Sequence, residues 1–170
     1  MSKLPEYVLD RMFDAPREMV WQAWTKPELL ARWYGPGVET IIHEFNLQVG
    51  GFWLNEMKWG DKSMLSKAVF TKIEPNELLV WDHSAADENW NVVANPMMPD
   101  WPTTLATTVS FEDVGAKTKV RLVWTPVNAT QAELNCFSGA MANMGRGWES
   151  GYAIMDEIFA ELQSDDSPTA

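Results

Sequence analysis

The residues best suited to chemistry are few: two histidines, His43 and His83, and a single cysteine, Cys136. Each histidine falls in a segment expected to be a β-strand, where side chains alternate between two faces. By this alternation His43 shares a face with Ile41, and His83 shares one with Trp81. A histidine on an apolar face can orient a ligand or act as a general acid or base. A structural, hydrogen-bonded histidine is nevertheless the more frequent case.

Metal binding and covalent catalysis find little support in these residues. No second histidine, cysteine or carboxylate lies at a metal-ligand spacing from either histidine, so we expect no metal site. Cys136 lies near the start of a predicted helix, and a nucleophilic role would need a paired base. A buried, inert thiol is the favoured interpretation. Because no nucleophile-elbow, phosphate-loop or dinucleotide motif is present, we expect no cofactor and no catalytic residue.

Tryptophan is the most unusual feature of the composition, with ten residues spread from Trp21 to Trp148. Large aromatic side chains indicate either a heavily aromatic core or an aromatic-lined cavity, and one surface can serve as both. Asn55 shares a strand face with aromatic and methionine neighbours, which makes it the favoured polar group to point inward. The residues expected to line a ligand cavity are Trp53, Asn55, Met57, Trp81, His83, Trp124, Met144, Trp148, Tyr152 and His43.

The charge balance excludes whole classes of partner. Thirteen basic residues stand against 24 acidic ones, which gives a net charge of −11 at pH 7. Nucleic acids and anionic membrane surfaces both require a basic protein surface, so we expect neither as a partner. A single cysteine excludes an intrachain disulfide, and no apolar run is long enough to span a bilayer. The expected compartment is the reducing cytoplasm.

A long C-terminal helix is predicted from Thr130 to Leu162. Its start is marked by a capping box, in which Thr130 is followed three residues later by Glu133. At about 1.5 Å per residue the helix would be roughly 50 Å long. Glycines inside it suggest close backbone approach, a bend or open space beside the helix. The apolar residues at helical spacing are Leu134, Phe137, Met141, Met144, Trp148, Tyr152, Met155, Phe159 and Leu162.

Most of the remaining chain reads as short helices and strands with tight turns. Two short helices follow the first strand, the first after Pro16 and the second ending near Trp33. The predicted strands cover residues 6–13, 38–47, 52–58, 64–73, 78–83, 103–112 and 118–126. Consecutive strands joined by short turns predict an antiparallel sheet. The expected fold is therefore α+β, with about seven strongly curved strands wrapped around the long helix.

Two segments fall outside this regular pattern. A long loop from Ser84 to Pro102 is rich in methionine, tryptophan and proline, and long ordered loops are often functional. We expect it to act as a lid over the cavity. Residues 1–163 are expected to form a single domain, and the polar residues 164–170 to form a disordered tail.

Several stretches together resemble the activator of heat-shock protein 90 ATPase homologue family, within the START-like superfamily. The resemblance spans roughly Tyr7 to Leu162 and rests on the order and spacing of weak motifs. The sequence differs from the family before the double glycine, where Asn46 and Gln48 replace a frequent acidic residue and arginine. The matching stretches are Ala15 to Trp21, Pro27 to Pro36, Val49-Gly50-Gly51, Ile73 to Leu78 and Gly147-Trp148.

The resemblance implies a helix-grip fold with an internal cavity, without implying one chemistry. Three functions follow as expectations. The first is non-enzymatic binding of a small apolar or amphipathic molecule between the sheet and the long helix. The second, implied by the family name, is binding to heat-shock protein 90 with stimulation of its ATPase. A cyclase- or hydrolase-like enzyme ranks last, because it needs two convergent titratable groups in the cavity.

Overall fold

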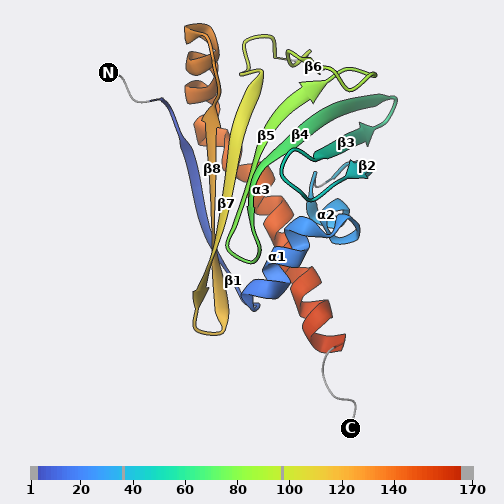
Figure 1. Ribbon diagram of the computed structural model, residues 1–170, viewed down its shortest axis with the longest axis vertical. Helices are drawn as coiled ribbons and strands as arrows, with labels where there is room; N and C mark the ends of the chain where they lie inside the picture. The colour runs from blue at the N-terminus through green and yellow to red at the C-terminus, as the bar shows by residue number, and fades with distance from the viewer. Residues whose placement is uncertain (1–3, 36, 97, 166–170) are drawn as a thin grey trace.

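A computed structural model describes residues 4–35, 37–96 and 98–165. The chain forms three helices and eight strands within these residues (Figure 1). The helices are α1 (Arg17–Thr25), α2 (Pro27–Trp33) and α3 (Gln131–Asp165). The strands are β1 (Tyr7–Phe13), β2 (Glu39–Phe45), β3 (Phe52–Trp59), β4 (Lys62–Glu74), β5 (Leu78–Ala86), β6 (Val92–Val93), β7 (Thr104–Val114) and β8 (Lys117–Pro126).

The strands form one antiparallel sheet in the order β1-β8-β7-β5-β4-β3-β2, with β6 paired to β5. Tight hairpins join most sequential strands, which makes antiparallel pairing the natural outcome. The first strand closes the far edge by pairing with the last, so that Tyr7 lies opposite Trp124. The predicted α+β fold with seven main strands is confirmed. The short strand β6 was not predicted, because two valines inside a polar loop carry no periodic pattern.

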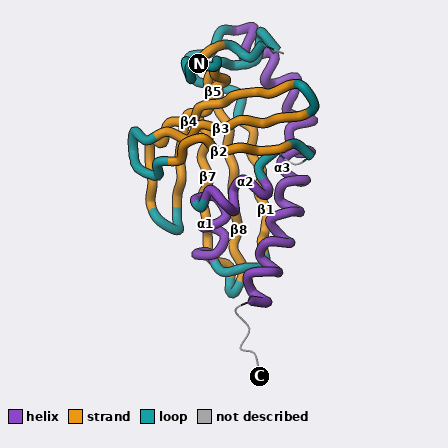
Figure 2. Tube along the Cα trace, turned by 90° about the vertical axis from the view of Figure 1, so that its right-hand side faces the viewer, coloured by secondary structure: helices purple, strands orange, loops and turns teal. Residues whose placement is uncertain are grey.

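Helix α3 runs beside the curved sheet, and Figure 2 shows the sheet bending around it. The two short helices, α1 and α2, contact the lower half of α3 (Figure 1). Helix α1 also contacts β7 and β8, so the short helices and α3 lie on the same face of the sheet. Inward-facing strand residues and one stripe of α3 form the core between them. Its largest fully buried side chains are Trp24, Trp33, Trp81, Tyr152, Phe13, Phe70, Phe137 and Phe159. The expected helix-grip arrangement is confirmed.

The start of α3 is fixed by the predicted cap. The backbone N–H of Glu133 donates to the hydroxyl of Thr130 over 3.1 Å. The Glu133 carboxylate also accepts the backbone N–H of Thr103, over 3.2 Å, which ties the end of the long loop to the helix. At its other end α3 continues to Asp165, two residues into the segment expected to be a tail. The rest of that segment, 166–170, lies outside the described residues.

A bulge in β2 changes which side chains face inward. Ile42 lies opposite Asn55, but the next residue in register is Glu44, opposite Leu54. The extra residue, His43, shifts the alternation, so that Ile42 and Phe45 both turn toward the helix.

Within the described residues no helix is long and apolar enough to cross a membrane.

Candidate functional site

A pocket of about 240 Å³ opens between α3 and the concave face of the sheet, at the end of α2. Its walls come from four separate elements: the end of α2, β5, β8 and the middle of α3. They are mostly aromatic, and no charged side chain stands among them in the part of the chain that the structure describes. The lining residues are Trp33, Tyr34, Gly35, His83, Trp124, Met144, Gly147, Trp148 and Gly151.

Stacked and edge-on indoles hold the aromatic wall in place. Trp148 of α3 meets Trp124 of β8 with ring centroids 5.4 Å apart, and stacks on Trp24 of α1 at 6.0 Å. Trp24 in turn meets Trp33 at 4.6 Å, edge to face. The indole N–H of Trp33 donates to the carbonyl of Ala23 over 2.8 Å, which fixes its orientation. The pocket wall is therefore rigid and continuous with the core.

Two glycines of α3 shape the pocket in opposite ways. A Cβ added at Gly151 would lie 2.8 Å from the carbonyl oxygen of Trp33, so this glycine lets α2 and α3 approach closely. A Cβ added at Gly147 would meet no atom within 4 Å. Gly147 is therefore an exposed position of the pocket lining that borders open space, where a side chain would meet no obstacle. The sequence suggested close backbone approach or open space beside the helix. Gly151 shows the first and Gly147, one turn earlier, shows the second.

His83 is the one imidazole at the pocket. It is partly exposed and also borders a second pocket of about 50 Å³. Its side chain makes no hydrogen bond to any described residue. Burial lowers the pKa of His83 to about 4, because desolvation disfavours the charged imidazolium. At neutral pH the ring is uncharged, with one nitrogen as a donor and the other as an acceptor.

The second pocket lies further along the same face, beneath the end of the long loop. Its lining includes Ser66 of β4, Asn95 and Trp101 of the loop, and His83. Trp101 packs on Phe137 of α3, with ring centroids 5.7 Å apart. The described loop residues thus cover this smaller pocket, whereas the lining of the larger one comes from other segments. A lid over the larger pocket stays a prediction, and Met97 of the loop lies outside the described residues.

The interior around the pockets contains several buried polar atoms without a hydrogen-bond partner among the described residues. The amide of Asn55, which is 2% exposed, has no hydrogen-bond partner for its oxygen or its nitrogen within the described chain. Five further buried donors or acceptors share this condition: Trp24 Nε1, Trp53 Nε1, Trp81 Nε1, Thr107 Oγ1 and Tyr152 Oη. A buried polar group without a partner costs about 1–3 kcal/mol. The core therefore retains polarity that packing alone does not require.

The structure brings four of the predicted lining residues together in the larger pocket: His83, Trp124, Met144 and Trp148. A second group, Trp53, Asn55, Trp81 and Tyr152, is buried in the surrounding core. Met57 is half-buried beside Gly35 of the pocket lining, where its methyl group would be 3.0 Å from a Cβ added at Gly35.

His43 does not join this group, which corrects its expected placement. Its Nε2 lies 2.8 Å from a carboxylate oxygen of Glu56, and its ring lies 5.4 Å from that of Trp90. The side chain is 42% exposed. The β2 bulge causes the error, because strict alternation from the inward-facing Phe45 would have placed His43 inward as well, whereas His43 stays on the outward face with Ile41, which lies opposite Glu56.

Sequence reasoning missed the contribution of α2 to the pocket. Trp33, Tyr34 and Gly35 end the helix and turn into the pocket wall. Gly35 adopts a φ of 76°, a conformation that favours glycine. The aromatic pair before this glycine was visible in the sequence, but nothing local indicates that it meets α3. Burial also raises the pKa of Tyr34, which keeps its phenol neutral.

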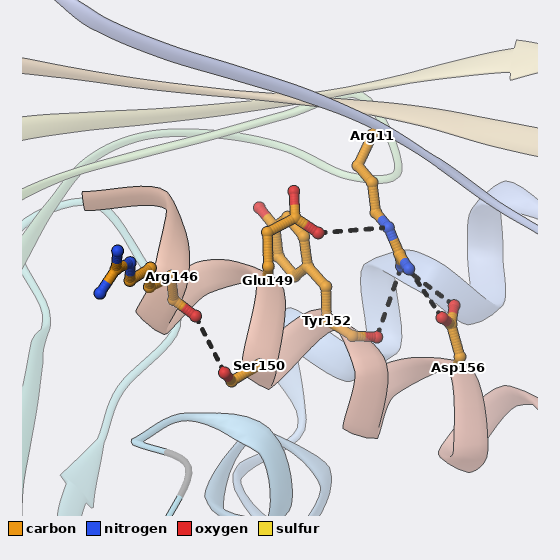
Figure 3. A network of polar contacts seen from close by, with 6 residues as sticks. All are labelled: Arg11, Arg146, Glu149, Ser150, Tyr152 and Asp156. Atoms are coloured by element: carbon orange, nitrogen blue, oxygen red, sulfur yellow. Dashed lines mark hydrogen bonds and ion pairs between the residues drawn. The ribbon is translucent and has the colours of Figure 1, made fainter. Parts of the chain in front are cut away.

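A polar network on the opposite side of α3 joins the helix to the sheet edge (Figure 3). The guanidinium of Arg11 on β1 donates to both carboxylate oxygens of Asp156, over 3.0 and 2.8 Å. It also reaches the carbonyl of Tyr152 at 3.4 Å and lies 3.9 Å from Glu149. Asp156 on the outer side of α3 is therefore ion-paired to the edge strand β1. Within the described residues no cluster of three histidine, cysteine or acidic side chains could hold a metal ion.

Comparison with known proteins decides the family. The family model described as activator of Hsp90 ATPase homolog 1-like protein matches residues 14–160. The chain belongs to this family. The recognised resemblance and the START-like, helix-grip fold are thereby confirmed. No curated protein matches the chain significantly.

Solved bacterial structures share the fold at low identity. Protein Ms6760 from Mycobacterium smegmatis is 18% identical, with a TM-score of 0.74 over 92% of this chain and 95% of that one. A protein from Rhodobacter sphaeroides is 19% identical, with a TM-score of 0.75 over 92% and 93%. A protein from Arthrobacter aurescens is 25% identical, with a TM-score of 0.74 over 89% and 86%. These matches show the shared fold, and they do not show a shared ligand.

Proposed function

We propose that this family member binds a small apolar or amphipathic molecule in the pocket between α3 and the sheet. The observation that carries the proposal is an apolar, aromatic-walled pocket of about 240 Å³ with room left at Gly147. Binding sites for small molecules are concave and largely apolar, with a few placed polar groups. Here Trp124 and Trp148 supply flat walls and His83 supplies the polar group. Among the described lining residues, only the neutral Tyr34 could share proton transfer with His83, so binding is favoured over catalysis.

The test fills the pocket from a position where a side chain does not disturb the fold. Gly147→Leu places a branched side chain in the open space, and replacing a helix glycine also raises helix propensity. Gly139→Leu is the matched control, since a Cβ there also meets no atom within 4 Å but Gly139 is outside the pocket lining. Both variants should fold. Intrinsic tryptophan fluorescence during titration with naphthalene and related apolar molecules reports occupancy.

We expect saturable quenching or a spectral shift in the unchanged protein and in the control variant Gly139→Leu. The response should be lost or weakened at least tenfold in Gly147→Leu, because the added side chain occupies the ligand volume. The proposal fails if no apolar probe binds the unchanged protein. It also fails if Gly147→Leu and Gly139→Leu bind equally well.

The family description supports a second candidate, a chaperone partner. It names activation of the Hsp90 ATPase, and such a role needs an exposed apolar contact surface. Leu47, Val49 and Phe52 around the β2–β3 turn are 36%, 66% and 37% exposed. Retention on immobilised heat-shock protein 90 at low salt, lost in Val49→Asp, would support this candidate. Absence of retention would remove it without affecting the pocket proposal.

A further inference from the structure

We propose that the ligand is a neutral, two-ring aromatic molecule with one hydrogen-bonding group, and that His83 binds this group. The inference rests on the proposed function and narrows it to a ligand class. Three independent observations carry it: the volume of the pocket, the absence of charge on its described walls, and an imidazole without a side-chain partner in a mostly aromatic lining.

The volume sets the size of the ligand. An apolar cavity of about 150 Å³ is large enough to bind benzene. The pocket here, at about 240 Å³, exceeds that by enough for a second fused ring. Drug-sized ligands usually occupy pockets of about 300 Å³ or more, so a larger molecule would extend out of this one.

The aromatic walls of the pocket favour a flat ligand. Trp124 and Trp148 present indoles whose planes meet at 73°. A flat ring can lie against one of these indoles and present its face to the edge of the other, an arrangement that aromatic pairs favour. Met144 adds a polarizable, adaptable side chain on the α3 side. A flat aromatic ligand therefore gains more contact here than a flexible chain of the same volume.

The lack of charge sets the ionisation state of the ligand. No lysine, arginine or acidic side chain belongs to the described lining of either pocket. An ion transferred from water into such a site stays unpaired, which is strongly unfavourable. The protein as a whole also carries a net charge of −11, which repels anions. A carboxylate-bearing ligand is therefore disfavoured against its neutral counterpart.

His83 is the polar contact that such a ligand needs. Its strand neighbours in register are Ala68 on β4 and Leu105 on β7, both apolar and both buried. The neutral ring can donate to a carbonyl or accept from a hydroxyl. The ring has no hydrogen-bond partner among the described residues, so a ligand hydroxyl that bonds to it adds affinity beyond its apolar contact.

The experiment compares three probes of the same ring system: naphthalene, 2-naphthol and 2-naphthoate. Calorimetric titrations at neutral pH measure each dissociation constant with the unchanged protein, His83→Leu and His83→Gln. We expect 2-naphthol to bind about tenfold more tightly than naphthalene, and 2-naphthoate to bind most weakly. His83→Leu should abolish the preference for 2-naphthol while naphthalene still binds. His83→Gln, which keeps a donor and an acceptor, should restore part of it.

Each other outcome overturns the inference in a recognisable way. Equal affinities for naphthalene and 2-naphthol, or a preference that survives in His83→Leu, exclude His83 as the polar contact. Tightest binding of 2-naphthoate excludes a neutral ligand. In both cases Gly147→Leu would still block binding, so the proposed function would stand. If none of the three probes binds, the inference and the proposed function fail together. The comparison of probes on the unchanged protein keeps the test valid even if a variant folds poorly.

Discussion

The indole of Trp148 on α3 meets the indole of Trp124 on β8 edge-on, with ring centroids 5.4 Å apart and planes at 73°. This contact joins the long helix to the sheet at the wall of the larger pocket. Trp148 is only 8% exposed, so it belongs to the core as well as to the pocket. Packed core and aromatic-lined cavity were the two interpretations of the tryptophan content, and this indole both packs in the core and lines a pocket. Stability and binding can therefore be separated only by changes that leave these rings in place.

The two pocket glycines of α3 should respond to alanine with opposite signs. Gly151→Ala would bring a Cβ to 2.8 Å from the backbone carbonyl of Trp33, forcing α2 away from α3. We expect a loss of about 1–3 kcal/mol in the free energy of unfolding. Gly147→Ala meets open space and should stabilise by up to about 1 kcal/mol through helix propensity. Urea unfolding followed by circular dichroism measures both, and equal effects would contradict the close contact.

Two buried threonines should respond differently to valine, which has nearly the same shape. Thr107 is fully buried and its hydroxyl has no partner among the described residues, so Thr107→Val should stabilise by about 1 kcal/mol. Thr118 is equally buried but donates to the carbonyl of Ala15 over 2.8 Å. Thr118→Val should destabilise by about 1–3 kcal/mol, because it leaves that carbonyl unpaired. Destabilisation by Thr107→Val would instead mean that its hydroxyl has a partner in solution.

His83 should make stability depend on pH. The unfolded chain protonates this histidine near its ordinary pKa of 6.5, whereas the folded protein does so only near 4. Between these values the unfolded state binds more protons, so stability falls as pH is lowered from 6.5 toward 4. The loss should approach roughly 3 kcal/mol over the whole window. In His83→Gln, the free energy of unfolding should lose the pH dependence that comes from the histidine and keep the part that comes from the carboxylates. Urea unfolding at a series of pH values measures both proteins. Identical pH profiles would contradict the expected role of His83.

The Arg11–Asp156 pair should contribute a modest, measurable coupling between β1 and α3. Both carboxylate oxygens accept hydrogen bonds from the guanidinium, a geometry that favours a real interaction over a loose surface contact (Figure 3). The Arg11 side chain is 25% exposed and that of Asp156 is 46% exposed, so water screens the pair. A double-mutant cycle with Arg11→Gln and Asp156→Asn should give about 0.5–1 kcal/mol. A coupling of zero would show that the pair is not formed in solution.

The elements of the fold were predictable because each has its own periodic pattern. Phe137, Trp148, Tyr152 and Phe159 recur at helical spacing, and all four are buried on one stripe of α3. Thr130 marked the start of the helix by a local chemical preference that needs no tertiary partner. Helical spacing and helix capping depend on residues that are close together in the sequence, so a single sequence is enough to identify them.

The pocket was predictable only in part, because it depends on register and on contacts between distant segments. Strand and helix parity pointed His83 and Trp148 to the concave face of the sheet, and both residues line the larger pocket. His43 was not, because one inserted residue in β2 reverses the parity and leaves no mark in composition. Trp33 reaches the pocket through the packing of α2 on α3 at Gly151, a contact between positions that no local pattern connects.

The most direct test of a ligand in this pocket is the methyl signal of Met144 during titration with 2-naphthol. Met144 lines the pocket, whereas Met12 lies on the outer face of β1 and is 43% exposed, so it serves as an internal reference. Spectra of protein labelled at the methionine methyl carbon, with Met144 assigned from Met144→Leu, resolve both. The account predicts a saturable shift of the Met144 signal with the Met12 signal unchanged. An unchanged Met144 signal, or equal shifts of both signals, would contradict it.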